Sequence, residues 1–489
     1  MLNAIRKLLG WQSLTILLLI LFTVACSNIQ GKMQTSSKQS PPVVLILWDD
    51  DTTSWMTILR CWLTDFPCIF EPQTSDVFFA RSFDGGATFS RPINVSNKSD
   101  FAGDPQLGVS GNMVLITWID GDFPRQRILM KRSIDRGVTF GSPAILSDGA
   151  LYPRYLRLDA SGRTVVVTWA EGNPGGGDDD IFLTGSTDGG STFSSPINLT
   201  KSPRFSGDHQ VSIVGDIVLV AWTDDPPGSY SEDIFIVRST DGGRTFGPSI
   251  NLSRSPESSS EPRLIAKGDI ILVAWQDNAS QENSLNDIFL VRSTDRGATF
   301  GLPVNLTNTR RTSKSPNLMI ANDTVIVTWQ DEDYRDNTNS FWVRSTDWGE
   351  TFNYPVNLSL TTGLTSNPSL EIIGDIVMVA WTAYPSGLWG ASIDYIMRST
   401  DGGATFGSPI SMWKSPKDDI THFQFTNTGN MILATWVIQT PPESSWLFRR
   451  PSKWAIFLTR STDRGATFEP FIKLWSYTGF STPRMAFLP

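Results

Sequence analysis

The chain has 489 residues with a formal net charge of −9, 40% hydrophobic residues and 18% charged residues. This composition is typical of a globular protein. The absence of any Lys- or Arg-rich run argues against a nucleic-acid partner, because phosphate binding depends on basic surface. A chain of this length normally forms several domains unless one repeat architecture accommodates all of it.

The first 26 residues have the features of an export signal. Arg6 and Lys7 precede an apolar run over residues 14–25, which is short for a membrane span. The run ends in "FTVACSN", which resembles the lipobox of exported lipoproteins, although Thr23 stands where Leu is commoner. We therefore predict lipidation at Cys26. Ordinary cleavage and an uncleaved signal anchor are the alternatives.

The segment after the signal, residues 27–42, is polar and rich in Ser and Gln, which suits a flexible tether. The predicted organisation is a signal at 1–26, this tether, and one domain at 43–489. We expect an exported protein held at the cell surface through a membrane anchor.

The chain contains three cysteines. If Cys26 carries lipid, Cys61 and Cys68 in "CWLTDFPC" remain as an even pair in an exported chain, which predicts a disulfide. Metal ligation by the two thiols is the weaker alternative.

An eight-residue pattern, S-x-D-x-G-x-T-F, recurs along the domain, and we call it the box. Successive copies are separated by 51 to 62 residues, a period that indicates an array of supersecondary units, with propellers the leading candidate. The boxes begin at Ser82, Ser133, Ser186, Ser239, Ser293, Ser345, Ser399 and Ser461.

Upstream of each box is a short apolar run that ends in Trp, as in "DIVLVAW" ending at Trp222. Such β-branched runs without polar alternation predict strands buried on both faces. A segment such as "PRLIAK" (262–267) precedes the Trp strand. "DIFLVRS" (287–293) and "PVNLT" (303–307) show the strands on either side of the box. Each unit therefore predicts four antiparallel strands, the content of one propeller blade.

The two ends of the domain predict closure of the ring. The first unit begins at "VVLILW" (43–48) with no strand before it, and the chain ends in an extra "TPRMAFLP" (482–489) that resembles the opening strand of a unit. We predict an all-β, eight-bladed propeller of four-stranded antiparallel blades, in which the C-terminal strand completes blade one and removes its free edge.

The box resembles the Asp-box, or bacterial neuraminidase repeat, of sialidases and related propellers, and the resemblance covers all eight units. It implies a turn between the third and fourth strands, on the side away from the active site. A short Asp side chain accepts N–H bonds within a turn, and Gly supplies positive φ. Since eight identical carboxylates cannot serve one catalytic centre, we interpret all eight as structural: Asp84, Asp135, Asp188, Asp241, Asp295, Asp347, Asp401 and Asp463.

Arginines at the start of the innermost strand are the candidate ligand-binding residues. Four units open that strand with Pro-Arg, while Gln106, Asn317 and Ser369 take the matching place elsewhere. Their guanidinium groups could clamp a carboxylate at the mouth of the central channel; the alternative is local pairing with acids such as Glu261 and Asp159. The four arginines are Arg154, Arg204, Arg263 and Arg484.

A carboxylate two residues after the blade Trp is the second candidate feature. It could form an acidic rim that binds cations or sugar hydroxyls, or it could cap the hairpin turn. The six residues are Asp50, Asp120, Glu171, Asp224, Asp277 and Asp331. "GGGDDD" (175–180) could hold Ca²⁺ through oxygen ligands, and a solvated acidic loop is the alternative. We expect no other metal and no cofactor.

Sialidases use an arginine triad for the substrate carboxylate, a Tyr/Glu nucleophile pair and an Asp acid/base, and they have six blades. This chain has no Arg-Ile-Pro motif, and its catalytic residues stay unassigned; Tyr152 and Tyr155 could be nucleophiles or structural aromatics. We therefore expect a monomeric sialidase-like propeller that binds acidic glycan or protein ligands at its loop face without catalysis. The alternatives are an exo-acting glycoside hydrolase of exo-alpha-sialidase type, which cleaves terminal sugar acids, and a purely structural envelope protein.

Overall fold

The computed structural model describes most of the propeller domain. The described ranges are 41–51, 75–97, 101–172, 179–202, 204–225, 231–280, 285–307, 311–333, 337–359, 364–365, 368–385, 392–415, 420–440, 444–445, 448–449, 453–478 and 483–488. The predicted lipidation at Cys26 and the predicted disulfide between Cys61 and Cys68 lie outside these ranges. Within them, no helix is both long and apolar enough to cross a membrane.

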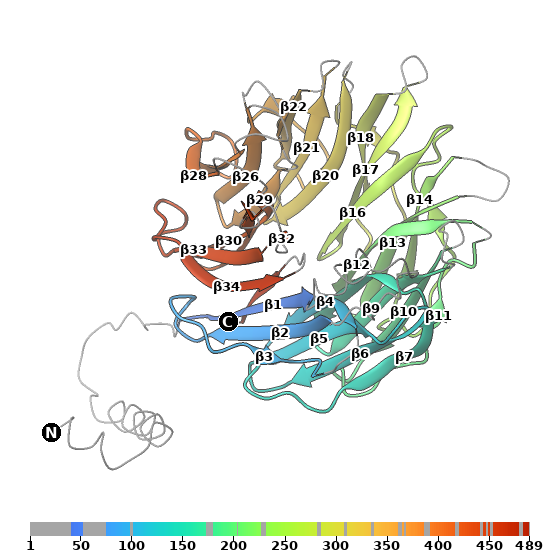
Figure 1. Ribbon diagram of the computed structural model, residues 1–489. Coiled ribbons are helices and arrows are strands. Elements are labelled where there is room, and N and C mark those ends of the chain that lie inside the picture. Colours follow the sequence, from blue (N-terminus) through green and yellow to red (C-terminus); the bar gives the residue numbers. More distant parts are fainter. Residues whose placement is uncertain are drawn as a thin grey trace, which may run out of the picture. The chain divides into compact units, whose positions relative to one another are not determined.

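The domain consists of eight blades, each a sheet of four antiparallel strands, arranged as a ring (Figure 1). In blades one to eight the innermost strands are β35 (Arg484–Leu488), β4 (Ala102–Ser110), β8 (Arg154–Ser161), β12 (Ser206–Val214), β16 (Ser259–Lys267), β20 (Thr312–Ala321), β25 (Ser369–Ile373) and β29 (Ile420–Thr428). The second strands are β1 (Val43–Asp51), β5 (Met113–Asp120), β9 (Thr164–Glu171), β13 (Ile217–Asp224), β17 (Ile270–Ser280), β21 (Thr324–Glu332), β26 (Ile376–Tyr384) and β30 (Met431–Thr440).

The outer half of each blade is formed by a long third strand and a fourth strand that is only two residues long in five blades. The third strands are β2 (Ser75–Ser82), β6 (Arg125–Ser133), β10 (Asp180–Ser186), β14 (Asp233–Ser239), β18 (Leu285–Ser293), β22 (Thr338–Ser345), β27 (Ser392–Ser399) and β33 (Lys453–Ser461). The fourth strands are β3 (Ile93–Asn94), β7 (Ala144–Leu151), β11 (Ile197–Asn198), β15 (Ile250–Asn251), β19 (Val304–Asn305), β23 (Val356–Asn357), β28 (Ile410–Ser415) and β34 (Ile472–Thr478).

Three short strands lie outside this plan. β24 (Leu364–Thr365) pairs with β26 of blade seven beyond the end of the innermost strand, and β31 (Ser444–Ser445) pairs with β32 (Phe448–Arg449) between the second and third strands of blade eight.

The second strands form the core of every blade, as their apolar sequences predict. In β5 every residue is buried, and the blade tryptophans are at most 3% exposed. In six blades the Trp ring stacks on an aromatic ring of the third strand, with centroids 5.7–6.2 Å apart. Because each fully buried aromatic side chain contributes about 1.5–3 kcal/mol, this repeated pair is a major source of stability.

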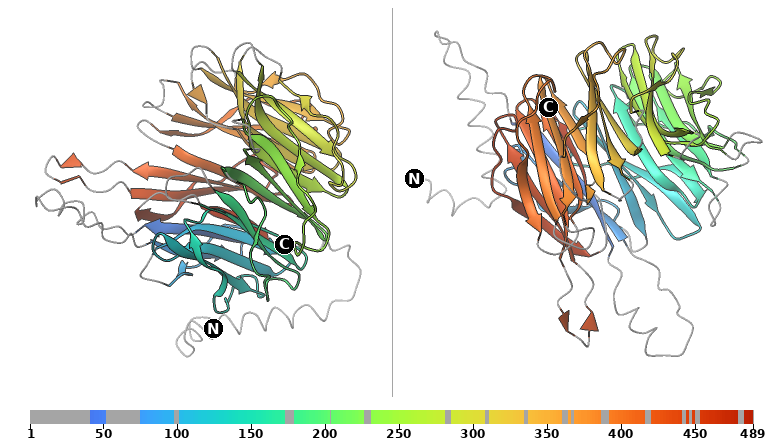
Figure 2. Two further views of the ribbon diagram at one scale, coloured as in Figure 1. Left: turned by 90° about the vertical axis from the view of Figure 1, so that its right-hand side faces the viewer. Right: turned by 90° about the horizontal axis from the view of Figure 1, so that it is seen from above.

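The C-terminal strand closes the ring, as predicted. β35 pairs with β1 in antiparallel register, with Val43 opposite Leu488 and Leu47 opposite Arg484. Each innermost strand contacts the innermost strand of the next blade, including β29 with β35 and β35 with β4. Figure 1 accordingly shows the first and last blades side by side, and Figure 2 shows two further views of the blades.

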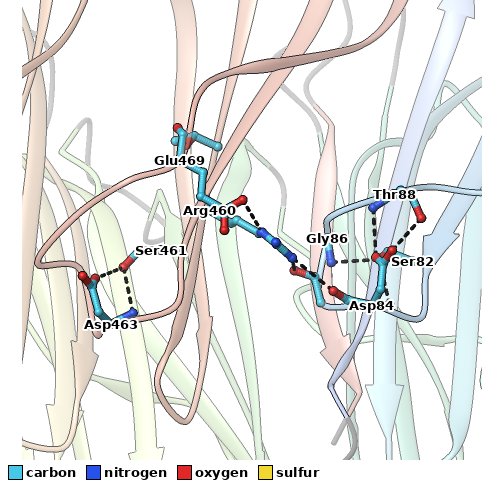
Figure 3. Close-up of polar contacts among 10 residues, drawn as sticks. Ser82, Asp84, Gly86, Thr88, Arg460, Ser461, Asp463 and Glu469 are labelled. Atoms are coloured by element: carbon cyan, nitrogen blue, oxygen red, sulfur yellow. Dashed lines mark hydrogen bonds and ion pairs between the residues drawn. The ribbon is translucent and has the colours of Figure 1, made fainter.

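The box forms the turn between the third and fourth strands of all eight blades. In each copy the Ser hydroxyl donates to one Asp oxygen at 2.6–2.7 Å and the Thr hydroxyl donates to the other at 2.5–2.7 Å. Figure 3 shows this network around Asp84 and part of it around Asp463. At Gly86, φ is +84° and an added Cβ would lie 3.0 Å from Leu433 of blade eight, which explains the Gly of the box.

Arginines that precede the box connect neighbouring blades. The guanidinium group of Arg238 donates to the carbonyl of Arg296 at 2.8 Å, and Arg398 donates to that of Arg464 at 2.9 Å. Between blades eight and one, Arg460 donates to the carbonyl of Asp84 at 3.1 Å (Figure 3). The boxes therefore hold both their own turn and the junction with the next blade.

The recurring Asn-x-Ser/Thr sequence after the box is a second turn motif. Asn198 donates its side-chain amide to Asp180 at 2.7 Å, and the Thr200 hydroxyl donates to the same carboxylate at 2.6 Å. Blades four and five repeat this arrangement. A turn function therefore accounts for the repetition of this sequence.

Candidate ligand site at the axis of the ring

The innermost strands of blades two to six share a β-bulge of the same form near their first residues, and the innermost strand of blade eight has a shorter one. The register shifts between Gly103 and Gln106 in blade two, and at the matching positions in blades three to six. In blades two to six, each bulge places one residue other than Gly in the left-handed region, with φ between +49° and +55°. These residues are Asp104, Tyr155, Asp208, Glu261 and Ser315. Strained backbone of this kind clusters at functional sites, which directs attention to this end of the ring.

In every blade one residue of the innermost strand pairs with the residue directly before the blade Trp, and in blades two to six it is the residue that follows the bulge. We call these eight positions the axial ring. In blades one to eight they are Arg484, Gln106, Arg157, Gln210, Arg263, Asn317, Ser369 and Gln424. The axial ring is polar throughout, and it carries arginine in blades one, three and five.

The strand register shows that two of the four predicted arginines, Arg154 and Arg204, do not lie at axial positions. Arg154 lies before the bulge of β8 and forms an ion pair with Asp179, and Arg204 precedes β12 with its guanidinium 3.7 Å from Asp225. The matching positions in these blades are occupied by Arg157 and Gln210. The Pro-Arg alignment failed because the dipeptide stands at a different position relative to the bulge in each of these blades: Arg154 is three residues before the axial position and Arg204 is six residues before it. Arg263 and Arg484 lie where the prediction placed them.

Arg157 could have been found from the sequence. The axial residue lies twelve positions before the blade Trp in every blade from two to eight, as Arg157 lies before Trp169. This offset is set by the pairing of the first two strands, whereas the Pro-Arg dipeptide has no fixed place relative to that pairing.

The charge of Arg157 acts on both of the other axial arginines. Burial lowers the pKa of Arg263, and Arg157, two blades away, lowers it further. Burial also lowers the pKa of Arg484, and the charge of the same Arg157 adds to this effect. Since Arg157 interacts with guanidinium groups two blades away on either side, the three side chains gather positive charge at the centre, in a chain whose net charge is negative.

Carboxylates from the bulges surround these cations. Glu261 and Asp208 both raise the pKa of Arg263, and Asp104 raises that of Arg484. Asp104 itself is largely buried, and this burial raises its pKa, with Arg157 and Arg484 among the groups that oppose the increase. One Asp104 oxygen accepts from the Leu156 backbone at 2.7 Å and the other from Gln106 at 3.0 Å.

His209 lies in the bulge of β12 and is 1% exposed. Burial lowers the pKa of its imidazole to about 3, and the charge of Arg157 lowers it further. The ring is therefore neutral at physiological pH and adds no cation to the site. The side chain of His422, the second histidine, lies outside the described part of the structure.

The predicted acidic rim is part of the scaffold. Four of its carboxylates accept a hydrogen bond from the blade Trp two residues earlier, at 2.6–3.0 Å: Glu171, Asp224, Asp277 and Asp331. Asp120 is 1% exposed and pairs with Arg127 at 2.5 Å. Asp50 stands opposite Asp76 in the β1–β2 register. Partners within the blade therefore account for at least four of the six residues better than a ligand-binding rim does.

The loop considered for Ca²⁺ falls mostly outside the described residues, which include only Asp179 and Asp180 of "GGGDDD". Asp179 is buried against Arg154, and Asp180 accepts from the side chains of Asn198 and Thr200. The described residues contain no group of three or more His, Cys, Asp or Glu side chains arranged to hold a metal ion.

The sequence matches no protein-family model and no curated protein. Among solved structures, an ulvan lyase of a new polysaccharide lyase family matches with a TM-score of 0.46 and 11% identity, over 68% of this chain and 91% of that chain. An α-L-arabinofuranosidase from Fusarium graminearum matches with a TM-score of 0.38 and 13% identity, over 56% and 84%. An α-L-arabinanase from Penicillium chrysogenum matches with a TM-score of 0.36 and 13% identity, over 58% and 88%.

These three structural neighbours are enzymes that act on carbohydrates, and none of the three is named as a sialidase or as a binding module. The similarity covers part of this chain and concerns only the backbone fold. The function proposed below therefore rests on the residues of this chain.

Proposed function

We propose that the propeller binds an acidic saccharide at the axial ring, with Arg157, Arg263 and Arg484 holding the carboxylate or another anionic group. The observation that carries the proposal is the register that places these three arginines at matching positions of alternate innermost strands, together with the effect of the Arg157 charge on both other guanidinium groups. Guanidinium groups bind planar anions through two parallel hydrogen bonds, which gives both affinity and orientation.

Two further features support a saccharide as the ligand. Gln106 and Gln210 stand between the arginines in the axial ring, and amides can donate to and accept from sugar hydroxyls. Asp104, Asp208 and Glu261 add acceptors near the cations. A site that combines a few cations with neutral hydrogen-bonding groups fits a hydroxylated acid better than a bare inorganic anion.

The test is calorimetric titration of the wild-type protein and an Arg157→Gln variant with two pairs of sugars. Sialyllactose is compared with lactose, and a hyaluronan tetrasaccharide with a chitin tetrasaccharide. Gln occupies the same position in the two flanking blades, so the substitution suits the fold. We expect only acidic sugars to bind, and we expect Arg157→Gln to weaken their binding roughly ten- to a hundredfold, as for the loss of a charged hydrogen bond.

Arg204→Gln is the matched control, because Arg204 is an arginine just before the innermost strand of the next blade but lies outside the axial ring. It should change the affinity less than threefold or so. A larger loss in Arg204→Gln than in Arg157→Gln would contradict the axial site. Equal binding of the acidic and neutral sugars would contradict anion recognition itself.

Hydrolysis of a terminal sugar acid is a second candidate function, favoured by Asp104. Its carboxyl is buried, has a raised pKa and lies within the field of Arg157 and Arg484, and such a group can act as a general acid. Asp208 or Glu261 would supply the second carboxylate that glycoside hydrolysis requires. Release of methylumbelliferone from its sialoside or glucuronide, lost in Asp104→Asn with binding retained, would support hydrolysis. No release by wild type would leave binding as the function.

We also propose that the domain acts outside the cytoplasm, tethered by residues 27–42 to a lipid on Cys26. Metabolic labelling with a radioactive fatty acid should mark the wild-type protein and not a Cys26→Ala variant. Label that persists in the variant would contradict an anchor at this residue. Thiol titration of the exported protein tests the Cys61–Cys68 disulfide, which free thiols would contradict.

A further inference from the structure

An aromatic cluster lies beside the axial ring, at the end of the propeller where the innermost strands begin. The rings of Phe101 and Phe123 have centroids 5.8 Å apart, and those of Phe123 and Tyr152 are 5.9 Å apart. Phe123 is 58% exposed, which is unusual for a large apolar side chain that already has two aromatic neighbours.

The main chain holds the cluster in place. Phe123 lies in the link between β5 and β6, where the Gly121 N–H donates to the Phe101 carbonyl at 2.9 Å. The Tyr152 N–H donates to the Pro124 carbonyl, also at 2.9 Å. An exposed aromatic ring on a fixed link loses little conformational freedom when a ligand covers it, so this surface is prepared for binding.

The aromatic residues are confined to one arc of the ring. The position five residues before the axial residue is Phe101 in blade two, Tyr152 in blade three and Phe205 in blade four, but Ser258 and Thr312 in the next two blades. Phe101 packs closely over Gly103, where an added Cβ would lie 2.6 Å from its ring. The arc is therefore centred on blade three, which carries Arg157.

The cluster is continuous with the axial cations. Asp104, three residues after Phe101, accepts a hydrogen bond from the Leu156 backbone, and Leu156 directly precedes Arg157. Tyr155, in the bulge of the same strand, is 49% exposed. An anion held by Arg157 would therefore have an aromatic surface next to it on one side.

We propose that Phe101, Phe123 and Tyr152 form a second subsite, in which the C–H face of a pyranose ring stacks beside the acidic sugar held at the axial ring. The ligand is then an oligosaccharide with an acidic residue joined to a further sugar, because one monosaccharide cannot occupy both places. This inference rests on the proposed function and specifies its substrate class.

The test measures binding of two monosaccharide–oligosaccharide pairs by titration calorimetry: methyl glucuronoside with a hyaluronan tetrasaccharide, and a methyl sialoside with sialyllactose. In wild type we expect the oligosaccharide of at least one pair to bind roughly five- to tenfold more tightly than its monosaccharide, the effect of one aromatic contact. Phe123→Ala should remove that difference and leave the monosaccharide affinity unchanged. Phe123→Tyr should retain it.

Tyr354→Ala is the matched control, because Tyr354 is 91% exposed but lies beside a box, and this variant should keep the difference. The stacking subsite is overturned if Phe123→Ala keeps the oligosaccharide preference, if it weakens monosaccharide and oligosaccharide equally, or if wild type shows no preference. If none of the four sugars binds wild type, the proposed function fails and the subsite fails with it. Binding of the monosaccharides alone would refute only the subsite.

Discussion

The two ends of this propeller each have eight repeated positions, one in each blade, but the residues at these positions are identical at one end and varied at the other. At the box end, eight Asp side chains make the same hydrogen bonds to Ser and Thr in every blade. At the axial end, eight positions with one common register hold three Arg, three Gln, one Asn and one Ser. A residue that is identical in every blade indicates a structural role that the fold requires in each repeat. Residues that differ from blade to blade at one register position indicate instead a surface for a ligand that is not symmetric.

The largest expected effect comes from opening the ring, on which both ends depend. Deleting residues 484–488 removes the innermost strand of blade one, including buried Leu488, and exposes the β1 edge. Loss of this pairing and apolar burial should cost several kcal/mol, a large part of ordinary domain stability. Urea denaturation measures the change.

Arg484→Gln is the control for that deletion, since it removes the cation but keeps the strand. It should leave the denaturation midpoint nearly unchanged while weakening ligand binding. A deletion variant that unfolds at the wild-type urea concentration would contradict the closure of blade one by this strand.

A buried carboxylate near the axis gives the next effect, and it depends on pH. Burial raises the pKa of Glu371 on β25 to about 7, and a hydrogen bond from Asn427 opposes part of that increase. The folded protein therefore retains a proton that the unfolded chain releases near pH 4.5, so this group makes stability fall as pH rises from about 4.5 to 7. Glu371→Gln should be up to about 3 kcal/mol more stable than wild type at pH 8.

At pH 4 the same two proteins should have nearly equal free energies of unfolding, because the native Glu371 is then neutral like Gln. Asp394→Asn offers an independent comparison, since burial also raises the pKa of Asp394 to about 7. A constant difference between wild type and Glu371→Gln from pH 4 to pH 8 would rule out titration of the buried carboxyl.

The contrast between the two ends also explains what the sequence could reveal. The blades and the closing strand followed from patterns that the backbone imposes on every repeat: the box, the Trp strand and their spacing. The site was harder, because Arg154 and Arg204 share the Pro-Arg dipeptide with Arg263 yet lie before the bulge. The dipeptide has no fixed place relative to the strand pairing, so matching by dipeptide failed where counting from the Trp strand would have succeeded.

Other parts of the site depend on contacts that no local pattern encodes. The meeting of Phe101, Phe123 and Tyr152 joins residues that precede the innermost strands of two blades with one from the short link between β5 and β6. Four carboxylates of the predicted acidic rim accept a hydrogen bond from the blade Trp of their own strand, as Asp277 does from Trp275, which favours a structural role for them. The sequence spacing alone could not distinguish a carboxylate that accepts a hydrogen bond from the Trp indole from one that is exposed to a ligand.

One substitution at each end of the propeller compares how much the box and the axial ring contribute to stability. Asp463→Ala leaves the Ser461 and Thr467 hydroxyls and the Thr467 N–H without their acceptor, which should cost about 1–2 kcal/mol. Asn317→Ala at the axial ring should cost less than about 0.5 kcal/mol. Thermal denaturation of both variants tests the ranking. An axial substitution that destabilises more than the box substitution would reverse our assignment of structural and functional ends.

The smallest effect is the acid dependence of the boxes, opposite in sign to that of Glu371. Hydrogen bonds from Thr467 and Ser461 hold the pKa of Asp463 at about 2, below the value of 3.8 for a free Asp. Its contribution to stability is therefore fully present above about pH 4 and is lost as pH falls through 2. The difference in stability between wild type and Asp463→Ala should shrink over that interval, as urea titrations at pH 5, 3 and 2 would measure. Because the side chain is largely exposed, each box contributes little alone, and a difference that stays constant down to pH 2 would show that the Asp acts through neutral hydrogen bonds rather than through its charge.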